Sequence, residues 1–232
     1  MRTLLVGLAL SVSLVLTLSA CVSTVDGRAV RAAGTAPADV PPLTEAQLDG
    51  VLLSIGELNG IVGSTQMTVT SELDEMTDHS ADLSDPKCVG AIYGAEEPVY
   101  AGSGWTAVRD QVAREPSEDN DHWVEQTAVL YPSADQAQAF VDSSRTTWEE
   151  CQASDITVDD GADSYVWQMD PVQFDGQLLT QVSEQRDADG WACQHALTAV
   201  SNVTVETWAC GYTISDEAAT IATEMVANAT ER

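Results

Sequence analysis

Alternating apolar and polar residues, interrupted by short turn sequences, run through much of the second half of the chain. In Trp191–Tyr212 (WACQHALTAVSNVTVETWACGY), two such runs flank Ser201 and Asn202, a pair typical of a two-residue turn. A hairpin closed by that turn places Cys193 opposite Cys210 at a non-hydrogen-bonded site, where side chains of facing strands lie closest. A longer loop would change this register. The pattern therefore predicts a hairpin that carries its own disulfide.

Apolar residues recur at the spacing of amphipathic helices in three places. We expect the first helix from Thr44 to about Gly60, the second from Ser133 to about Gln152, and the third to be capped by Ser215. The first two begin with Thr or Ser followed by Gln three residues later, which is the spacing of a capping box. Each of the three helices therefore presents one apolar face to a core.

Other apolar runs have the length of β-strands and end at turn-forming residues. They are Gln66–Thr70, Trp105–Arg114, His122–Tyr131, Ser164–Met169 and Gln177–Arg186. The acidic stretches 71–85 and 155–163 are interpreted as surface loops, and residues 88–93 as a short helix. Consecutive strands with tight turns, interspersed with helices, predict an α+β fold: an antiparallel sheet with its helices packed on one side.

The first twenty residues have the pattern of an export signal. The apolar run 4–18 is preceded by an arginine and is too short to span a membrane comfortably. The sequence Leu18-Ser19-Ala20-Cys21 then resembles a bacterial lipobox, which implies cleavage before the cysteine and a diacylglyceryl anchor on its sulfur. We therefore expect a lipoprotein signal peptide at 1–20, lipidated Cys21 with a flexible tether up to residue 42, and a domain at 43–232. The alternatives are an ordinary secretory signal and an uncleaved membrane anchor.

Lipidation of Cys21 would leave an even number of cysteines, which in an exported protein indicates a disulfide framework. The hairpin register selects Cys193–Cys210 and leaves Cys88 to pair with Cys151 at the end of the second helix. Each bond is expected to contribute roughly 3–4 kcal/mol. A zinc site is the competing use of four cysteines, but these spacings lack the CxxC-like pairs that zinc sites use.

The formal net charge of −28 excludes some classes of partner. Lys87 is the only lysine, and such a surface would repel nucleic acid and anionic lipid head groups. We therefore expect no nucleic-acid partner and contact with the membrane through the lipid anchor alone. The acidic stretch 71–85 could be a calcium loop, but the D-x-[DN]-x-[DN]-G spacing is absent.

Candidate chemistry is sparse. The histidines His79, His122 and His195 have no metal-ligand spacing, and GxSxG, P-loop and GxGxxG motifs are absent. Six tryptophans against two phenylalanines are many, and most lie in expected strands. Core packing explains them, or they line a cleft for an apolar or sugar-like ligand. In the hairpin register His195 lies opposite Trp208, which is typical of a partly buried sheet histidine.

Several segments together resemble the PknH-like extracellular sensor domain of mycobacteria and related actinobacteria. They are Cys88 in a short helix, the strand at 105–114, the segment His122–Gln152 (HWVEQTAVLYPSADQAQAFVDSSRTTWEECQ) and the closing hairpin at 191–212. The resemblance covers roughly residues 43–230. In that family the domain either lies outside a transmembrane Ser/Thr kinase or forms a separate lipoprotein. Because no kinase segment is present here, the separate form is implied.

The resemblance implies a twisted antiparallel sheet with flanking helices, the two disulfides paired as above, and a central cleft for an unidentified ligand. It supplies no catalytic residues, and only the four cysteines correspond residue by residue. We therefore expect a non-catalytic, lipid-anchored binding or sensor domain on the extracytoplasmic face, without cofactor or metal. The expected partner is an unidentified small ligand or an envelope protein. The candidate ligand-binding residues are Trp105, Trp123, Trp167, His195 and Trp208.

Two alternatives have distinct structural signatures. An envelope hydrolase would place a serine or an acidic residue within hydrogen-bond reach of His122 or His195 in the cleft. A protein-interaction module would show an exposed apolar patch in place of a concave pocket.

Overall fold

The computed structural model describes residues 40–116 and 120–231. The expected signal peptide, the lipidation site Cys21 and most of the tether lie outside these residues. Among the helices that the structure describes, none combines the length and the apolar character needed to cross a membrane.

The described strands form one antiparallel sheet, in the order β1-β2-β3-β9-β8-β7-β5-β4 with β6 beside β7. They are β1 (Thr68–Leu73), β2 (Ala107–Arg114), β3 (His122–Leu130), β4 (Asp155–Asp159), β5 (Ser164–Met169), β6 (Gln173–Asp175), β7 (Leu178–Gln185), β8 (Ala192–Val200) and β9 (Val203–Gly211). The last strand, β9, pairs with β3 and so joins the first three strands to the later ones. The prediction of an antiparallel α+β fold is confirmed.

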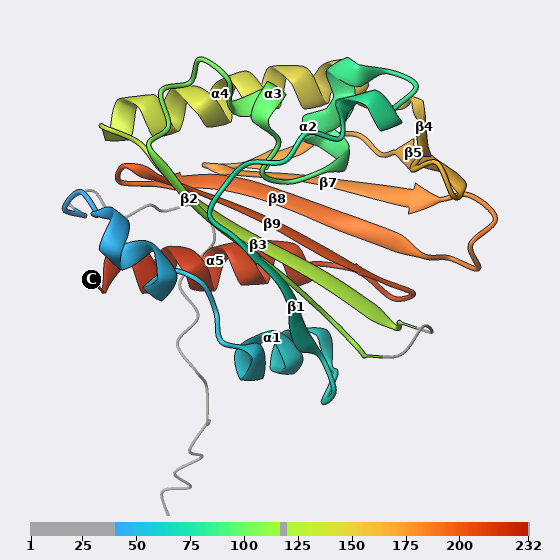
Figure 1. The fold of residues 1–232 in the computed structure, drawn as a ribbon, viewed down its shortest axis with the longest axis horizontal. Helices are drawn as coiled ribbons and strands as arrows, with labels where there is room; N and C mark the ends of the chain where they lie inside the picture. The colour runs from blue at the N-terminus through green and yellow to red at the C-terminus, as the bar shows by residue number, and fades with distance from the viewer. Residues whose placement is uncertain (1–39, 117–119, 232) are drawn as a thin grey trace, which may run out of the picture. The chain divides into compact units, whose positions relative to one another are not determined.

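Helices cover both faces of this sheet, where the sequence predicted one (Figure 1). They are a 3₁₀ helix (Glu45–Gly50), α1 (Ile55–Val62), two 3₁₀ turns (Ser80–Asp82 and Pro86–Cys88), α2 (Val89–Ile92), α3 (Glu97–Tyr100), α4 (Ala134–Cys151) and α5 (Glu217–Thr230). One core lies under α5, α1 and the first 3₁₀ helix, and a second lies under α2, α3 and α4. Strand β9 is buried along its whole length: Val203, Val205 and Ala209 belong to the first core, while Trp208 and Cys210 pack in a third, smaller cluster.

The hairpin of β8 and β9 has the predicted register. Cys193 pairs with Cys210 at a Cα–Cα distance of 4.0 Å, and the two sulfurs are bonded. Ser201 has a φ of 51°, as a two-residue turn of this kind requires. The buried amide of Asn202 accepts a hydrogen bond from the backbone N–H of Leu43 at 2.7 Å and donates to its carbonyl at 3.0 Å. The turn therefore also holds the start of the domain.

The second predicted disulfide, Cys88–Cys151, is present as well. It joins the last residue of α4 to the residue that precedes α2, and both sulfurs are buried. All four cysteines of the described domain are therefore engaged in disulfides, which rules out the zinc site that was their alternative use.

Three predictions of local structure were wrong in detail. The first helix is interrupted, because the backbone N–H of Leu53 donates to Gln126 on β3 at 2.7 Å, and Ser54 with Glu57 forms a second capping box that starts α1. The acidic stretches 71–85 and 155–163 are not loops throughout, because the first begins within β1 and the second begins with β4. Asp216, rather than Ser215, precedes the first turn of α5.

Candidate functional site

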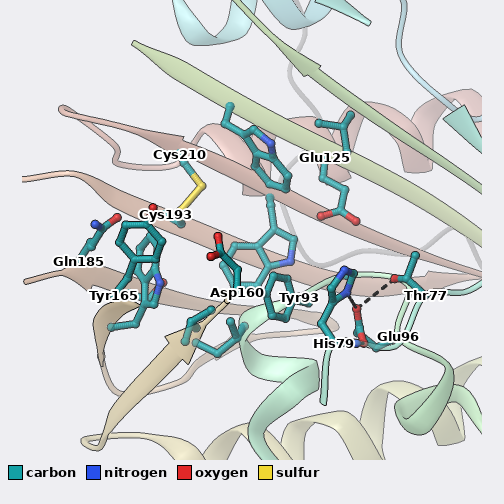
Figure 2. A pocket seen from close by; sticks show the side chains of 18 of the residues that line it. Thr77, His79, Tyr93, Glu96, Glu125, Asp160, Tyr165, Gln185, Cys193 and Cys210 are labelled. Atoms are coloured by element: carbon teal, nitrogen blue, oxygen red, sulfur yellow. Dashed lines mark hydrogen bonds and ion pairs between the residues drawn. A yellow bond between two sulfur atoms is a disulfide. The ribbon is translucent and has the colours of Figure 1, made fainter. Parts of the chain in front are cut away.

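A cavity of about 600 Å³ opens on the α4 face of the sheet. Helix α4 packs on β8 and β9 and leaves the opposite ends of the strands uncovered. The segment 92–96 after α2 and the hairpin of β4 and β5 roof this uncovered area (Figure 2). The cavity is therefore bounded by the sheet on one side and by two connecting segments on the other.

Several aromatic side chains line the cavity. Trp123, Trp167 and Trp191 pack around the disulfide Cys193–Cys210, together with Trp208 on β9. Tyr93 and Tyr165 approach from the segments that roof the cavity (Figure 2). Because strand positions two apart lie on one face, the register of β3 and β9 places Trp123 and Trp208 on the same face as Cys210. The cavity therefore has a wall of rigid apolar rings beside a disulfide.

Two buried carboxyl groups lie beside this wall. Asp110 on β2 accepts a 2.6 Å hydrogen bond from the hydroxyl of Thr127, yet burial raises the pKa of the Asp110 carboxyl. Burial raises the pKa of Glu125 well above its ordinary value, and the charges of Asp110 and Glu206 raise it further. Burial therefore favours the protonated form of both carboxyls relative to an exposed carboxyl.

A second polar group lies on the far side of the cavity. Glu96 is 1% exposed and accepts hydrogen bonds from Thr77 Oγ1 at 3.0 Å and from the backbone N–H of His79 at 2.8 Å. Nδ1 of His79 lies 2.6 Å from Glu96 Oε1 (Figure 2), and the His79 ring lies 4.7 Å from that of Tyr93. Nothing in the described residues groups three or more His, Cys, Asp or Glu side chains in a geometry that could hold a metal ion.

Behind the indole wall lies a fully buried polar network. The ring of His195 is held between Trp148 and Trp208, with centroid distances of 3.9 and 4.0 Å. Its Nε2 lies 2.9 Å from Glu206, whose other carboxylate oxygen accepts a 2.7 Å hydrogen bond from the hydroxyl of Tyr100. Burial lowers the pKa of His195, and the nearby Glu206 partly opposes that shift. The network therefore supports the Trp208 ring on the side that faces away from the cavity.

The structure brings together some of the sequence-predicted site residues and not others. Trp123, Trp167 and Trp208 line the cavity. Trp105 and His195 do not: Trp105 packs against the core under α4, and His195 lies behind Trp208.

Sequence reasoning missed the polar part of the lining and the residues of the roof. They include Asp110, Glu125, Glu96, Asp160, His79, Tyr93 and Tyr165, and the wall residue Trp191 was missed as well. A signal did exist for one of them, because Glu125 is two residues from Trp123 and shares its face of β3. The roof has no such periodic signal, since its residues lie in irregular segments.

The geometry matches neither the arrangement expected of an envelope hydrolase nor the exposed apolar patch expected of a protein-interaction module. His122 bonds Glu115 at 2.8 Å and lies outside the cavity lining, as does His195. Within the described residues no serine hydroxyl is hydrogen-bonded to a histidine ring. The exposed large apolar residues are Val69 on β1, Phe174 on β6 and Tyr212 after β9, and β1 and β6 lie far apart in the sheet order.

Comparisons with known proteins agree with this architecture. Residues 43–228 match the family described as the PknH-like extracellular domain. The chain is 37% identical over 185 residues to the serine/threonine-protein kinase PknH of Mycobacterium bovis and of Mycobacterium tuberculosis (strain H37Rv). The match covers 80% of this chain but only 31% and 30% of those two proteins.

A solved structure matches at the level of the fold. The crystal structure of the extracellular domain of PknH from Mycobacterium tuberculosis superposes with a TM-score of 0.79 at 34% sequence identity. The match covers 84% of this chain and 100% of that one. This chain therefore belongs to the PknH-like extracellular domain family.

Proposed function

We propose that this protein is a non-catalytic, extracytoplasmic ligand-binding domain that senses or carries a small molecule in the cavity between the indoles and the buried carboxyls. The observation that carries the proposal is the cavity of about 600 Å³, whose size suits a small organic ligand. Its rings are held by the sheet and by the disulfide Cys193–Cys210, so a ligand meets a wall that is already ordered. No cofactor is needed for this role.

The arrangement of polar groups favours binding over hydrolysis. Of the three histidines, His79 alone is part of the cavity lining, and its Nδ1 is engaged with Glu96. A serine hydrolase of the common kind needs its hydroxyl beside a histidine, and in the described part of the chain no serine hydroxyl is hydrogen-bonded to a histidine ring. The hydroxyl beside the buried carboxyls belongs to Thr127, which is itself fully buried and donates its hydrogen bond to Asp110.

The proposal includes a lipid anchor at Cys21, with the signal peptide at 1–20 and the tether at 21–42. Its support is the sequence Leu18-Ser19-Ala20-Cys21 and membership of an extracellular domain family. In an actinobacterial host, the wild-type chain should fractionate with membranes, and Cys21→Ala should appear in the culture medium. Mass spectrometry of the mature N-terminus should find a lipidated cysteine. Membrane association that survives Cys21→Ala would contradict the anchor.

Ligand binding is tested by native mass spectrometry of the full chain purified from an actinobacterial envelope. We expect a bound species at a fixed mass, lost or reduced in Trp191→Ala and retained in Trp105→Ala. The second variant is a matched control, because Trp105 is a half-buried tryptophan outside the cavity lining. Ligand occupancy should also change tryptophan fluorescence, since several indoles surround the site. An apo mass together with identical behaviour of both variants would contradict the proposal.

A further inference from the structure

We propose that the ligand is an organic cation, with its ammonium group near Glu125 and Asp160 and its apolar body against the indoles. This inference deepens the proposed function and rests on it. Two independent features carry it: the sign of the charged groups in the lining, and the aromatic character of the walls.

The charged lining is of one sign. Asp110, Glu125, Glu96 and Asp160 line the cavity, while none of the described lining residues is a lysine or an arginine. Glu96 is already hydrogen-bonded to His79. Asp160 reaches in from the turn after β4, where the backbone N–H groups of Asp163 and Ala162 keep its pKa low and its carboxylate ionised. An anionic ligand would therefore meet repulsion at this site, and a cation would meet attraction.

The walls offer the second feature. A cation over the face of an indole or a phenol ring is attracted by the negative face of the ring, by about 0.5–2 kcal/mol depending on desolvation. Trp123, Trp167, Trp191 and Trp208 all line the same cavity as these carboxyls, and Tyr93 and Tyr165 face them. A quaternary or alkylated ammonium suits this combination, because its methyl groups pack on rings while its charge remains.

The space around Glu125 is shaped by Gly94. A Cβ built on Gly94 would lie 2.7 Å from the Glu125 carboxyl oxygen Oε1. The roof can therefore approach this carboxyl closely only because residue 94 has no side chain. The buried indole N–H of Trp208 also has no hydrogen-bond partner in the described residues, which leaves the lining with an unused donor.

The cavity adjoins a smaller one of about 380 Å³, with which it shares Asn120, Gln185 and Trp191. The extension adds two more carboxyls, Asp121 and Asp189, and again no basic residue among the described lining. A longer cation, such as a polyamine or a cationic amphiphile, would find the same chemistry along both cavities.

Binding of a cation should displace a proton. The groups that face Glu125 are Asp110, Glu206 and Glu96, all acidic, and burial together with their charges holds its proton in the empty cavity. An ammonium group beside the Glu125 carboxyl would favour its ionised form, so the proton leaves to solvent as the cation enters. Affinity should consequently rise with pH until Glu125 is ionised in the empty protein.

The test compares two probes of the same shape that differ in charge: choline and 3,3-dimethylbutan-1-ol. The full chain carrying Cys21→Ala avoids detergent. By isothermal titration calorimetry we expect choline to bind at least about tenfold more tightly than its neutral isostere. Titration in two buffers of different ionisation enthalpy should detect the released proton at neutral pH.

Substitutions of single carboxyl residues test which of them cause the preference for choline. Glu125→Gln should remove most of the preference for choline and the proton release, and Asp160→Asn at the exposed rim should weaken choline binding severalfold. Glu72→Gln is the matched control, because Glu72 is an exposed carboxyl on β1 outside the cavity lining and should behave as the wild type. Circular dichroism checks that each variant is folded.

The outcomes separate this inference from the proposed function. Equal affinity for the two probes, or binding of neither, overturns the organic-cation inference. The proposed function would still stand in both cases if a neutral or anionic ligand is recovered with the native protein. A choline preference that Glu72→Gln abolishes as fully as Glu125→Gln would point to general surface charge and would also overturn the inference.

Discussion

Glu125 belongs to the proposed binding site, but its burial is expected to lower the stability of the folded domain. It lies on β3 between two buried strands, and burial with the charges of Asp110 and Glu206 raises its pKa well above the ordinary value of 4.5. When the folded-state pKa of an acid is raised, the unfolded state releases its proton first as pH rises. Glu125 should therefore destabilise the folded domain progressively above about pH 4.5, until it ionises in the folded state as well.

We predict that Glu125→Gln removes this pH-dependent loss of folding stability. The free energy of unfolding of the variant should exceed that of the wild type by an amount that grows with pH, at most about 1.4 kcal/mol per pH unit. Urea unfolding followed by circular dichroism between pH 4.5 and 8 measures the difference. Glu72→Gln should run parallel to the wild type over the same range. A difference that is constant with pH would mean that Glu125 is ionised in the folded protein.

At the scale of residues, the sequence predicted what depends on neighbours along the chain and missed what depends on distant ones. The pairing of Cys193 with Cys210 follows from the turn at Ser201 and Asn202, and it is correct. The burial of Glu125 depends on Gly94 and on strands β2 and β9, which no local pattern brings together. The polar part of the cavity lining could therefore not be predicted without knowing the sheet order.

At the scale of elements, the two disulfides hold different kinds of structure. Cys193–Cys210 spans 17 residues within one hairpin whose strands are already paired by hydrogen bonds. Cys88–Cys151 spans 63 residues and ties the end of α4 to α2, elements that share only part of one core. The longer loop restricts the unfolded chain more, so its bond should contribute more to stability.

We predict that the double variant Cys88→Ala/Cys151→Ala loses about 4 kcal/mol of unfolding free energy, and Cys193→Ala/Cys210→Ala about 3 kcal/mol. Urea unfolding of the two variants, compared with the wild type, gives both values. The hairpin variant should also weaken ligand binding, because its disulfide lies among the cavity indoles. Equal losses, with ligand binding unaffected in both, would contradict this division of roles.

The positions of the helices along the chain were easier to predict than the way in which they pack on the sheet. Helix α4 begins one residue after Ser133 as expected, since its capping residue and its apolar face are local signals. The prediction that all helices share one side failed because β8 and β9 are buried on both faces. Fully buried strands carry apolar residues at consecutive positions, so their pattern does not show how many layers cover them.

At the scale of the whole molecule, the distribution of charge is one-sided. The chain has 37 acidic and 9 basic residues. Several of the arginines already contact acidic groups: Arg109 with Glu45 and Asp49, Arg145 with Glu149, and Arg186 with Asp155. Acidic residues therefore far outnumber the basic residues that could neutralise them, and their mutual repulsion opposes folding. A surface of this kind also attracts any cation weakly, so general attraction must be separated from binding in the cavity.

Salt separates the two contributions, because it screens exposed charges over about 10 Å at 0.1 M and screens buried groups much less. We predict that raising NaCl from about 0.02 to 0.3 M stabilises the domain by roughly 1 kcal/mol, a rise of about 2–4 °C in Tm. Most of the gain in stability should be complete by 0.3 M, whereas stabilisation by exclusion of salt from the surface would keep growing at higher concentration.

Choline binding should weaken over the same range of salt, but the protein should still prefer choline to 3,3-dimethylbutan-1-ol, since Glu125 is buried. Differential scanning fluorimetry and calorimetry at matched salt concentrations measure both effects. Loss of the whole preference by 0.3 M would show that the cation is held by the surface and not by the cavity.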